Sequence, residues 1–270
     1  MPEPKAWRST LRAVFSQLPK TRCFPGNKNL LIFITLLLYS LSHQFLQAVI
    51  EGDEFYTKVG QNVAPELSEG WTIMLMDRAN RFIWVSACGT KDRTLFLQAI
   101  ETLVQVIEQT KDLTLLTDGE RRYGNILFEI CHEILRTGKP GRPRKTLPQG
   151  VVVRVKNKGS QSRKKGPKKP KYQTTCPTHP ETRTQVSDEQ THANHVEANN
   201  SAMRRKCSPY RRKTNTYAKS TNGLQRVLDM YWVIHNFVRS HFTTKQVPAV
   251  KLGILSEGLN PKQLLSVKFA

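Results

Sequence analysis

Two apolar runs of strand length, separated by only four residues, constrain the fold of this chain more than any other feature. They are Trp71–Asp77 and Phe82–Cys88, and residues 78–81 between them have the length of a hairpin link. The segment Glu51–Val59 upstream also has the character of a strand, with an acidic pair inside it. Because strands joined by short links pair with each other, we expect three antiparallel strands in a row.

A long amphipathic helix is predicted to follow the third strand. Asp92 is a suitable N-cap, and apolar residues recur at intervals of three and four from Leu95 to Ile107, so one face should pack on a sheet. Leu113–Thr117 then has the length and composition of a short buried strand. A second amphipathic helix should come next, with apolar residues on its inner face as far as Leu135, and Gly138 should stop it.

One further strand and two further helices complete the pattern. Val151–Val155 is β-branched and predicts a fifth strand, whereas Val196–Lys206 and Leu224–Val238 suit helices. The order of three strands, helix, strand, helix, strand and helix is that of an RNase H-like fold. This is an α/β fold with a mixed sheet, three antiparallel strands followed by parallel ones, and helices on both faces. We assign residues 50–255 to this domain and 256–270 to a C-terminal tail.

The distribution of charge indicates a polyanionic partner. The chain has 42 Lys and Arg against 21 Asp and Glu, which gives a formal net charge of +21. Residues 139–171 contain thirteen of these cations and no acidic residue, inside a basic insertion that we place at 139–193. Such clustering is typical of proteins that bind nucleic acid, and an anionic membrane surface is the alternative partner.

The first 49 residues differ from the rest and are interpreted as an atypical segment, basic and then apolar. Residues 30–41 (LLIFITLLLYSL) form an apolar run of about a dozen residues, whereas a membrane-spanning helix needs roughly 20. A membrane role is therefore not expected.

The cysteines favour a reducing, cytoplasmic location. They stand at 23, 88, 131, 176 and 207, are odd in number and include no CxxC pair, which argues against a disulfide framework. Cys176 and His179 could form a zinc site with His192 and His195, but the apolar residues expected between the two pairs are missing.

Three acidic residues stand out by their positions in the predicted topology. Asp53 lies in the first strand, Asp118 at the carboxyl end of the fourth, and Glu197 in the first turns of the helix after the basic insertion. The first and fourth strands should be neighbours at the centre of the sheet, with the late helix across their ends. Clustered carboxylates repel each other unless a cation neutralises them, and hard divalent ions prefer oxygen ligands. The trio therefore predicts a site for two Mg²⁺ (or Mn²⁺) ions, an arrangement suited to chemistry on a phosphodiester.

Other polar residues leave alternatives open. Glu54 could replace its neighbour in the first strand, but it should point to the opposite face. Asp77 is either a hairpin residue or a metal ligand. Glu120 either supports the metal ligands from behind or serves as an acidic charge at the start of a helix, and His195 is expected to hydrogen bond near Glu197.

The segments that carry these acidic residues resemble the catalytic half of DDE transposases of the bacterial insertion-sequence-one family (InsB type). They are GDEFYTKVG at 52–60, LLTDGERRYG at 115–124, HANHVEANNSAMRRKCSPYRRKTNTYAKS at 192–220 and GLQRVLDMYWVIHNFVRSHFTTKQVPAVKLGI at 223–254. The resemblance implies that Asp53, Asp118 and Glu197 hold the metal ions. It also implies a Mg²⁺-dependent DNA transposase that cleaves insertion-sequence ends and transfers the strand to a target, as a homodimer or a larger assembly.

Relatives of this kind carry a zinc-ribbon and helix-turn-helix region before the first Asp, and residues 1–49 do not match it. We interpret this segment as a degraded or frame-disrupted start. The alternative function is that of a decayed element remnant, which binds DNA non-specifically without transposing it. In both cases double-stranded DNA is the expected partner, and association with the nucleoid is the expected location.

Two groups of basic residues are the predicted DNA contacts. Residues 139–145 (KPGRPRK) resemble an AT-hook core, which keeps an extended backbone in the minor groove. The arginines that follow Glu197 should hold phosphates, and Tyr210 and Tyr217 among them either stack on bases or pack in the core. The predicted contacts are Arg142, Arg144, Lys145, Lys164, Lys165, Arg204, Arg205, Arg211 and Arg212.

Overall fold

Strand β1, Ala48–Tyr56, lies near the middle of a six-stranded mixed sheet with the strand order β3-β2-β1-β4-β7-β8. The computed structural model describes residues 48–61, 63–110, 112–135, 142–155, 176–177, 192–212 and 215–261. The remaining strands of this sheet are β2 (Trp71–Asp77), β3 (Ile83–Gly89), β4 (Leu113–Thr117), β7 (Val151–Val155) and β8 (Cys176–Pro177).

The pairing of the strands agrees with the predicted mixed sheet. β1 pairs with β2 and β2 with β3 in antiparallel orientation, whereas β1 pairs with β4 and β4 with β7 in parallel orientation. Three strands have the bounds expected from the sequence: β2, β4 and β7. β1 instead begins at Ala48 and ends at Tyr56, three residues earlier than expected, because Ala48 and Ile50 are buried in the sheet.

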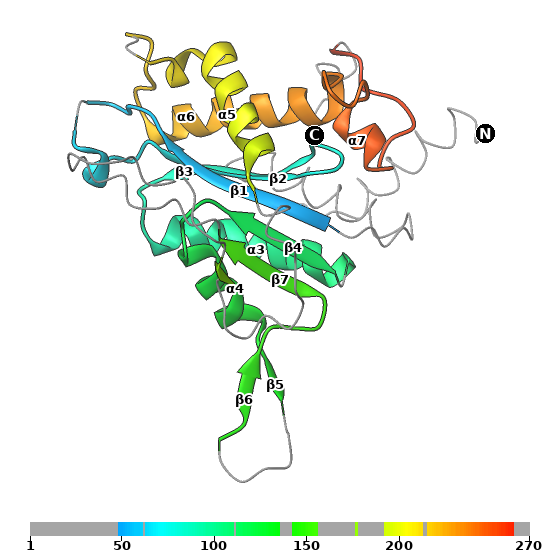
Figure 1. Ribbon diagram of the computed structural model, residues 1–270. Coiled ribbons are helices and arrows are strands. Elements are labelled where there is room, and N and C mark those ends of the chain that lie inside the picture. The colour runs from blue at the N-terminus through cyan, green and yellow to red at the C-terminus, as the bar shows by residue number, and fades with distance from the viewer. Residues whose placement is uncertain are drawn as a thin grey trace, which may run out of the picture.

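Helices cover both faces of the sheet (Figure 1). α3 (Arg93–Thr110) and α4 (Arg122–Cys131) lie on one face. α5 (Asn194–Lys206) and α6 (Thr221–Val233) lie on the other, and a π-helical turn (Ile234–Val238) and the short helix α7 (Pro248–Lys251) follow α6. This gives a three-layer α/β domain.

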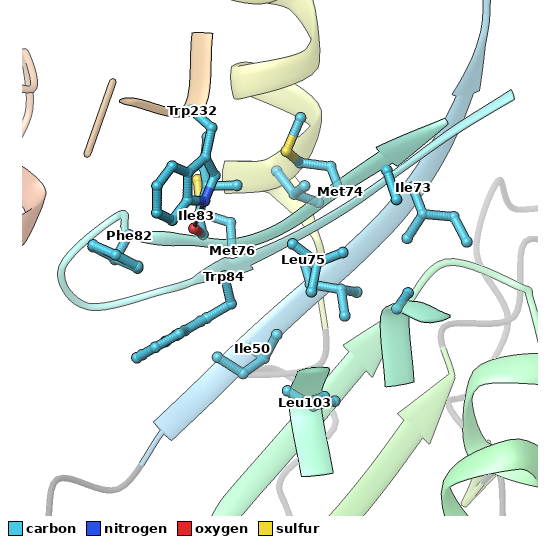
Figure 2. Close-up of a cluster of buried hydrophobic side chains, with 14 of the residues drawn as sticks. Ile50, Ile73, Met74, Leu75, Met76, Phe82, Ile83, Trp84, Leu103 and Trp232 are labelled. Atoms are coloured by element: carbon cyan, nitrogen blue, oxygen red, sulfur yellow. Dashed lines mark hydrogen bonds between the residues drawn. The ribbon is translucent and has the colours of Figure 1, made fainter. Parts of the chain in front are cut away.

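The core fills both spaces between the sheet and its helices. In Figure 2, Ile50, Trp84 and Leu103 lie on one side of β2 and β3, whereas Ile83 and Trp232 lie on the other. All five side chains are almost completely buried. A strand that is covered on both faces has no polar side to expose, which explains why β2 reads as a continuous apolar run rather than an alternating one.

The edge of the sheet at β3 is closed by side chains from α6 and the turn after it. Asn236 accepts from the backbone N–H of Ile83 and donates to its carbonyl oxygen, at 2.9 Å each. Gln225 accepts from the amide of Cys88 and donates to the carbonyl of Ser86. Because these bonds use backbone groups that would otherwise be exposed at a sheet edge, they fix α6 along β3 and protect that edge.

The second helix is shorter than the sequence predicts. We expected it to continue to Gly138, but α4 ends at Cys131, and His132 has an extended backbone. Residues Glu133–Leu135 form strand β5, which pairs antiparallel with β6, Arg144–Thr146. Ile134, expected on the inner face of the helix, is 58% exposed. The prediction failed because the helical spacing of apolar residues continues past Cys131, whereas the strand that pairs with this segment, β6, comes later in the chain.

The basic and apolar N-terminal segment predicted at 1–49 lies outside the described residues, apart from its last two positions in β1. Most of the basic insertion and the end of the C-terminal tail also lie outside them. Within the parts of the chain that the structure describes, no helix is long and apolar enough to cross a membrane.

Candidate active site at the carboxyl ends of β1 and β4

Asp53 in β1 and Asp118, the residue directly after β4, each follow the last paired residues of two adjacent parallel strands. The register of β1 and β4 ends with Gly52 opposite Thr117, so the next residues along the two strands are Asp53 and Asp118. The strands approach closely here, because a Cβ atom on Gly52 would lie 3.3 Å from Cγ2 of Thr117 and 2.9 Å from Cδ2 of Leu75. The expected proximity of these two backbone positions is therefore present, in spite of the 65 residues that separate them in the sequence.

The turn after Asp118 ends strand β4 and leads into α4. Gly119 has a φ angle of +81°, a conformation that side chains disfavour, and so the glycine of the Thr-Asp-Gly sequence allows the chain to leave the sheet at this point. Both carboxylate oxygens of Asp118 are shielded from solvent. The carboxylate of Asp118 thus lies inside the protein at the end of the strand rather than on an exposed loop.

Helix α5 runs along β1 on the face to which Asp53 points. Nδ2 of Asn200 donates a hydrogen bond to Oδ2 of Asp53 at 2.8 Å. Further along both elements, the guanidinium of Arg204 lies 5.6 Å from the ring centre of Phe55. The middle of α5 thus lies over Asp53 and its carboxyl end over Phe55, two residues of β1 whose side chains point to the same face of the sheet.

Glu197 is carried on the same part of α5. It precedes Asn200 by three residues and Arg204 by seven, so the three residues follow one side of the helix. Glu197 is half-buried. The structure therefore assigns Glu197 to the part of the helix that lies over β1, next to the residue that contacts Asp53. The side chains of the predicted trio are not among the groups whose ligand atoms all lie within 4.8 Å of one another in the described residues.

A fourth carboxylate, Glu51, was not singled out by the sequence. Its side chain is fully buried on the same face of β1 as Asp53. Oε1 accepts a hydrogen bond from Nε of Arg78 at 2.6 Å and lies 2.7 Å from Nδ1 of His195. Burial raises the pKa of Glu51, but hydrogen bonds from His195 and Arg78 outweigh this effect and hold the pKa below its usual value. The only sequence signal was its spacing of two from Asp53, which places both on one face of a strand.

Glu51, His192 and His195 form a group that could hold a metal ion, because one ligand atom from each lies within 4.8 Å of the others. Nδ1 of His192 is 3.9 Å from Oε1 of Glu51. Arg78 already supplies a positive charge at that oxygen. For Glu51 to bind a metal ion through Oε1, the guanidinium would have to move away.

The two histidines thus have a different partner from the one the sequence indicated. His195 was expected beside Glu197, and its ring contacts Glu51 instead. The alternative zinc set is only partly within the described residues. Cys176 lies in β8, which is three strands away from β1, or roughly 14 Å at the usual spacing between strands. His179 lies outside the described residues.

Glu54 and Glu120 belong to a network on the opposite face of the sheet. Glu54 accepts hydrogen bonds from Nζ of Lys91 at 3.0 Å and from the hydroxyl of Tyr123 at 3.3 Å. Glu120 accepts from the backbone and the guanidinium of Arg122, at the first residue of α4. Glu120 therefore acts as an acidic group at the start of a helix, the second of its two predicted roles. Glu54 points away from α5, as its place in the strand predicts.

Asp77 is a hairpin residue. Its Oδ1 accepts hydrogen bonds from the backbone N–H groups of Ala79 at 2.7 Å and Asn80 at 3.0 Å, which closes the turn between β2 and β3. Burial raises the pKa of Asp77 to about 6, although these hydrogen bonds act in the opposite direction. In the register of β1 and β2, Asp77 lies opposite Ile50, at the other end of β1 from Phe55.

Basic side chains gather at the end of α5 and in the segment after it. Arg205, Arg211 and Arg212 are exposed, whereas Arg204 is half-buried over Phe55. Tyr210 packs in the core, with its hydroxyl 2.6 Å from that of Thr72. Tyr217 is half-buried and lies beneath the ammonium groups of Lys219, at 3.7 Å, and Lys58, at 5.5 Å. Lysines thus add to the arginines predicted on this surface.

The second predicted DNA-binding group lies far from α5. Strands β5 and β6 form a hairpin that projects from the domain on the side of α4 (Figure 1). Arg142 and Lys145 are exposed on it, and Arg144 is the first residue of β6. Residues 139–145 were expected to keep an extended backbone in the minor groove. From Arg144 onward the chain is instead paired with β5. A two-stranded ribbon has the width that the major groove admits. Lys164 and Lys165 lie outside the described residues.

Comparison of the chain with models of known protein families and with functionally characterised proteins finds no match. The functional assignment consequently depends on the residues of the site and their geometry.

Proposed function

We propose that this protein is a DNA transposase of the DDE type, which cleaves phosphodiester bonds and transfers the cut strand with the help of Mg²⁺ or Mn²⁺. The observation that carries the proposal is the convergence of three distant segments at one place. Asp53 lies in β1, Asp118 directly follows the adjacent parallel strand β4, and Asn200 ties the helix that bears Glu197 to Asp53. The strand order and the helices on both faces support an RNase H-like fold as the frame of this site.

The donor set suits hard divalent ions. Asp53, Asp118 and Glu197 offer only oxygen atoms, which Mg²⁺ and Mn²⁺ prefer, and no cysteine or histidine belongs to the proposed trio. A pair of such ions, when bound, activates a water or a 3′-hydroxyl and stabilises the leaving oxygen. The contribution of this chain is to hold the carboxylates on rigid elements: two strands of a central sheet and a helix packed along one of them.

Exposed arginines beside the site account for the substrate class. Arg205 lies in the last turn of α5, directly after Arg204, and Arg211 and Arg212 follow the helix. Their cations would hold the phosphates of the DNA strand, and the net charge of +21 would draw DNA to the protein. The hairpin of β5 and β6 supplies a second basic surface. Joining two element ends requires two active sites, so a homodimer or a larger assembly on DNA is part of this proposal.

The proposal is tested by the variant Asp118→Asn. It keeps the shape of the side chain and removes the negative charge that a divalent ion requires. We expect the wild-type protein to convert supercoiled plasmid DNA to nicked circles in Mg²⁺ or Mn²⁺, and the variant to lose this activity by at least about 100-fold. The affinity for a labelled duplex, measured by fluorescence anisotropy, should stay within about twofold, because phosphate contacts carry most of the binding.

Asp92→Asn is the matched control, because Asp92 caps the first turn of α3 through a bond to Leu95 that asparagine can also make. It should nick plasmid at the wild-type rate. A wild-type protein that binds duplex DNA but never nicks it would support the decayed, non-transposing remnant instead. Nicking that survives in Asp118→Asn would remove Asp118 from the site.

A further inference from the structure

The N-terminus of α5 is capped by a residue from β1. Oε2 of Glu51 accepts hydrogen bonds from the backbone N–H groups of His195, at 2.9 Å, and Val196, at 3.1 Å. These amides lie in the first turn, where a helix has no acceptors of its own. Ala193 at the N-cap position makes no side-chain bond, so the acceptor comes from a residue about 144 positions away. A carboxylate at this end of the helix also interacts favourably with the helix dipole.

The charge of Glu51 is balanced by Arg78, from the turn between β2 and β3. Nε of Arg78 donates to Oε1 of Glu51, and its Nη2 donates to the backbone carbonyl of His192, just before α5. A buried carboxylate is costly unless it is paired and fully hydrogen bonded. Arg78 meets this requirement and at the same time ties the chain that enters α5 to the sheet.

Two hydrogen-bonded contacts hold α5 on β1, and their spacing along the helix matches their spacing along the strand. Between residues 195 and 200 the helix rises about 7.5 Å, and between residues 51 and 53 the strand advances about 6.6 Å. The bond to Glu51 and the bond from Asn200 to Asp53 therefore fix the helix at two points with little mismatch. Glu197 lies between these points, directly after Val196.

We propose that Glu51 is a positioning residue, which caps α5 from within β1 and thereby sets the place of the Glu197 carboxylate relative to Asp53. This inference rests on the proposed function, because it assumes that both carboxylates bind the same metal ions. Glu51 itself is not a ligand in this arrangement. Both of its oxygens are engaged by hydrogen-bond donors, and the guanidinium of Arg78 supplies the counter-charge.

The experiment compares Glu51→Gln with Glu54→Gln in the full-length chain. Both residues lie in β1, both are paired with a cation, and they point to opposite faces of the sheet. Arg78→Lys is the second variant, because its side chain is partly exposed and lysine keeps the charge while losing the double contact. Three quantities are measured: amide hydrogen exchange at residues 195–197, Mn²⁺ affinity by electron paramagnetic resonance, and the rate of plasmid nicking.

We expect the amide hydrogens of His195 and Val196 to exchange faster in Glu51→Gln and in Arg78→Lys than in the wild type. Their Mn²⁺ affinity and nicking rate should fall about 10- to 100-fold, the usual effect of losing a residue that orients metal ligands. Duplex affinity, measured by fluorescence anisotropy as a control, should stay unchanged, and Glu54→Gln should match the wild type in the other three measurements. Higher Mn²⁺ concentrations should restore part of the nicking rate, which a general loss of folded protein would not allow.

Two results with the variants would overturn the inference alone. One is unchanged amide exchange in both variants, which would mean that Glu51 does not hold the helix. The other is faster exchange with wild-type Mn²⁺ affinity and nicking, which would make the cap purely structural. A wild-type protein that binds Mn²⁺ but does not nick DNA would refute the proposed function alone, because Mn²⁺ affinity still reports on the position of Glu197. A wild-type protein that binds no Mn²⁺ would refute both.

Discussion

Nδ2 of Asn200, on α5, donates a hydrogen bond to Oδ2 of Asp53, on β1, across 2.8 Å, although 147 residues separate them in the chain. Asn200 is almost completely buried, and this bond joins the helix to the central strand at the level of the proposed metal site. It restricts the rotation of the Asp53 carboxylate. Asn200 is therefore a support for a proposed ligand rather than a core residue that happens to be polar.

Replacing Asn200 by alanine should lower the nicking rate about 10-fold and weaken Mn²⁺ binding by a similar factor, because Asp53 loses the donor that orients it. Asn194→Ala is the control, since Asn194 is exposed at the start of the same helix. Plasmid nicking as a function of Mn²⁺ concentration measures both effects. Equal curves for the two variants would contradict the supporting role of Asn200.

Asp77→Asn should stabilise the protein increasingly as the pH rises above 3.8. The pKa of Asp77 is raised by burial from 3.8 to about 6, so the folded state carries a cost for its charge at higher pH. Asparagine can accept the same hydrogen bonds from Ala79 and Asn80 without that cost. The gain should develop as the pH rises from 3.8 to 6, reach about 3 kcal/mol at pH 8, and be lost below about pH 3, where aspartate is protonated in both states. Urea unfolding at pH 4 and pH 8 measures it, and an equal difference at both values would refute the explanation.

His235 should make the protein sensitive to acid. Burial lowers the pKa of His235 from 6.5 to about 4, and its Nε2 lies 2.9 Å from the carbonyl oxygen of Arg81. Between these two values the unfolded chain binds a proton that the folded protein does not, so stability falls as the pH decreases from 6.5 to 4. The loss should be about 3 kcal/mol relative to His235→Gln, whose side chain does not titrate. The free energy of unfolding of both proteins is measured by urea unfolding between pH 4 and pH 6.5. The same dependence on pH in both would exclude the effect.

The exposed arginines in the last turn of α5 and after it should govern the dependence of DNA binding on salt. Each of the substitutions Arg205→Ala, Arg211→Ala and Arg212→Ala should reduce the slope of log K against log salt concentration by about 0.9, the value for one phosphate contact on duplex DNA. Lys251→Ala, at an exposed position in α7, is the control for the loss of one positive charge. Anisotropy titrations at several salt concentrations measure this slope. If Lys251→Ala changed the slope as much as the arginine variants do, net charge alone would explain the effect.

The sequence by itself determined five strands of the sheet, with bounds correct to within three residues, and most of the helices. Trp71–Asp77, Leu113–Thr117 and Val151–Val155 have the predicted bounds because their apolar and β-branched residues mark a buried strand in any surroundings. The alternation of sides along a strand also separated Glu54 from Asp53 correctly, since it depends only on local geometry. The end of α4 was predicted wrongly, because the strand that pairs with Glu133–Leu135 follows later in the chain.

Tertiary structure alone decided the role of Glu51. In the sequence it is one acidic residue among several near the first strand. Its carboxylate accepts hydrogen bonds from the N-terminus of α5 and from Arg78, which are 144 and 27 residues away in the sequence. Local propensity reports what a segment of chain favours in isolation, whereas a buried carboxylate is stable only when donors from other segments surround it. No local pattern in β1 could encode that arrangement, because the donors become neighbours only when the sheet and α5 have assembled.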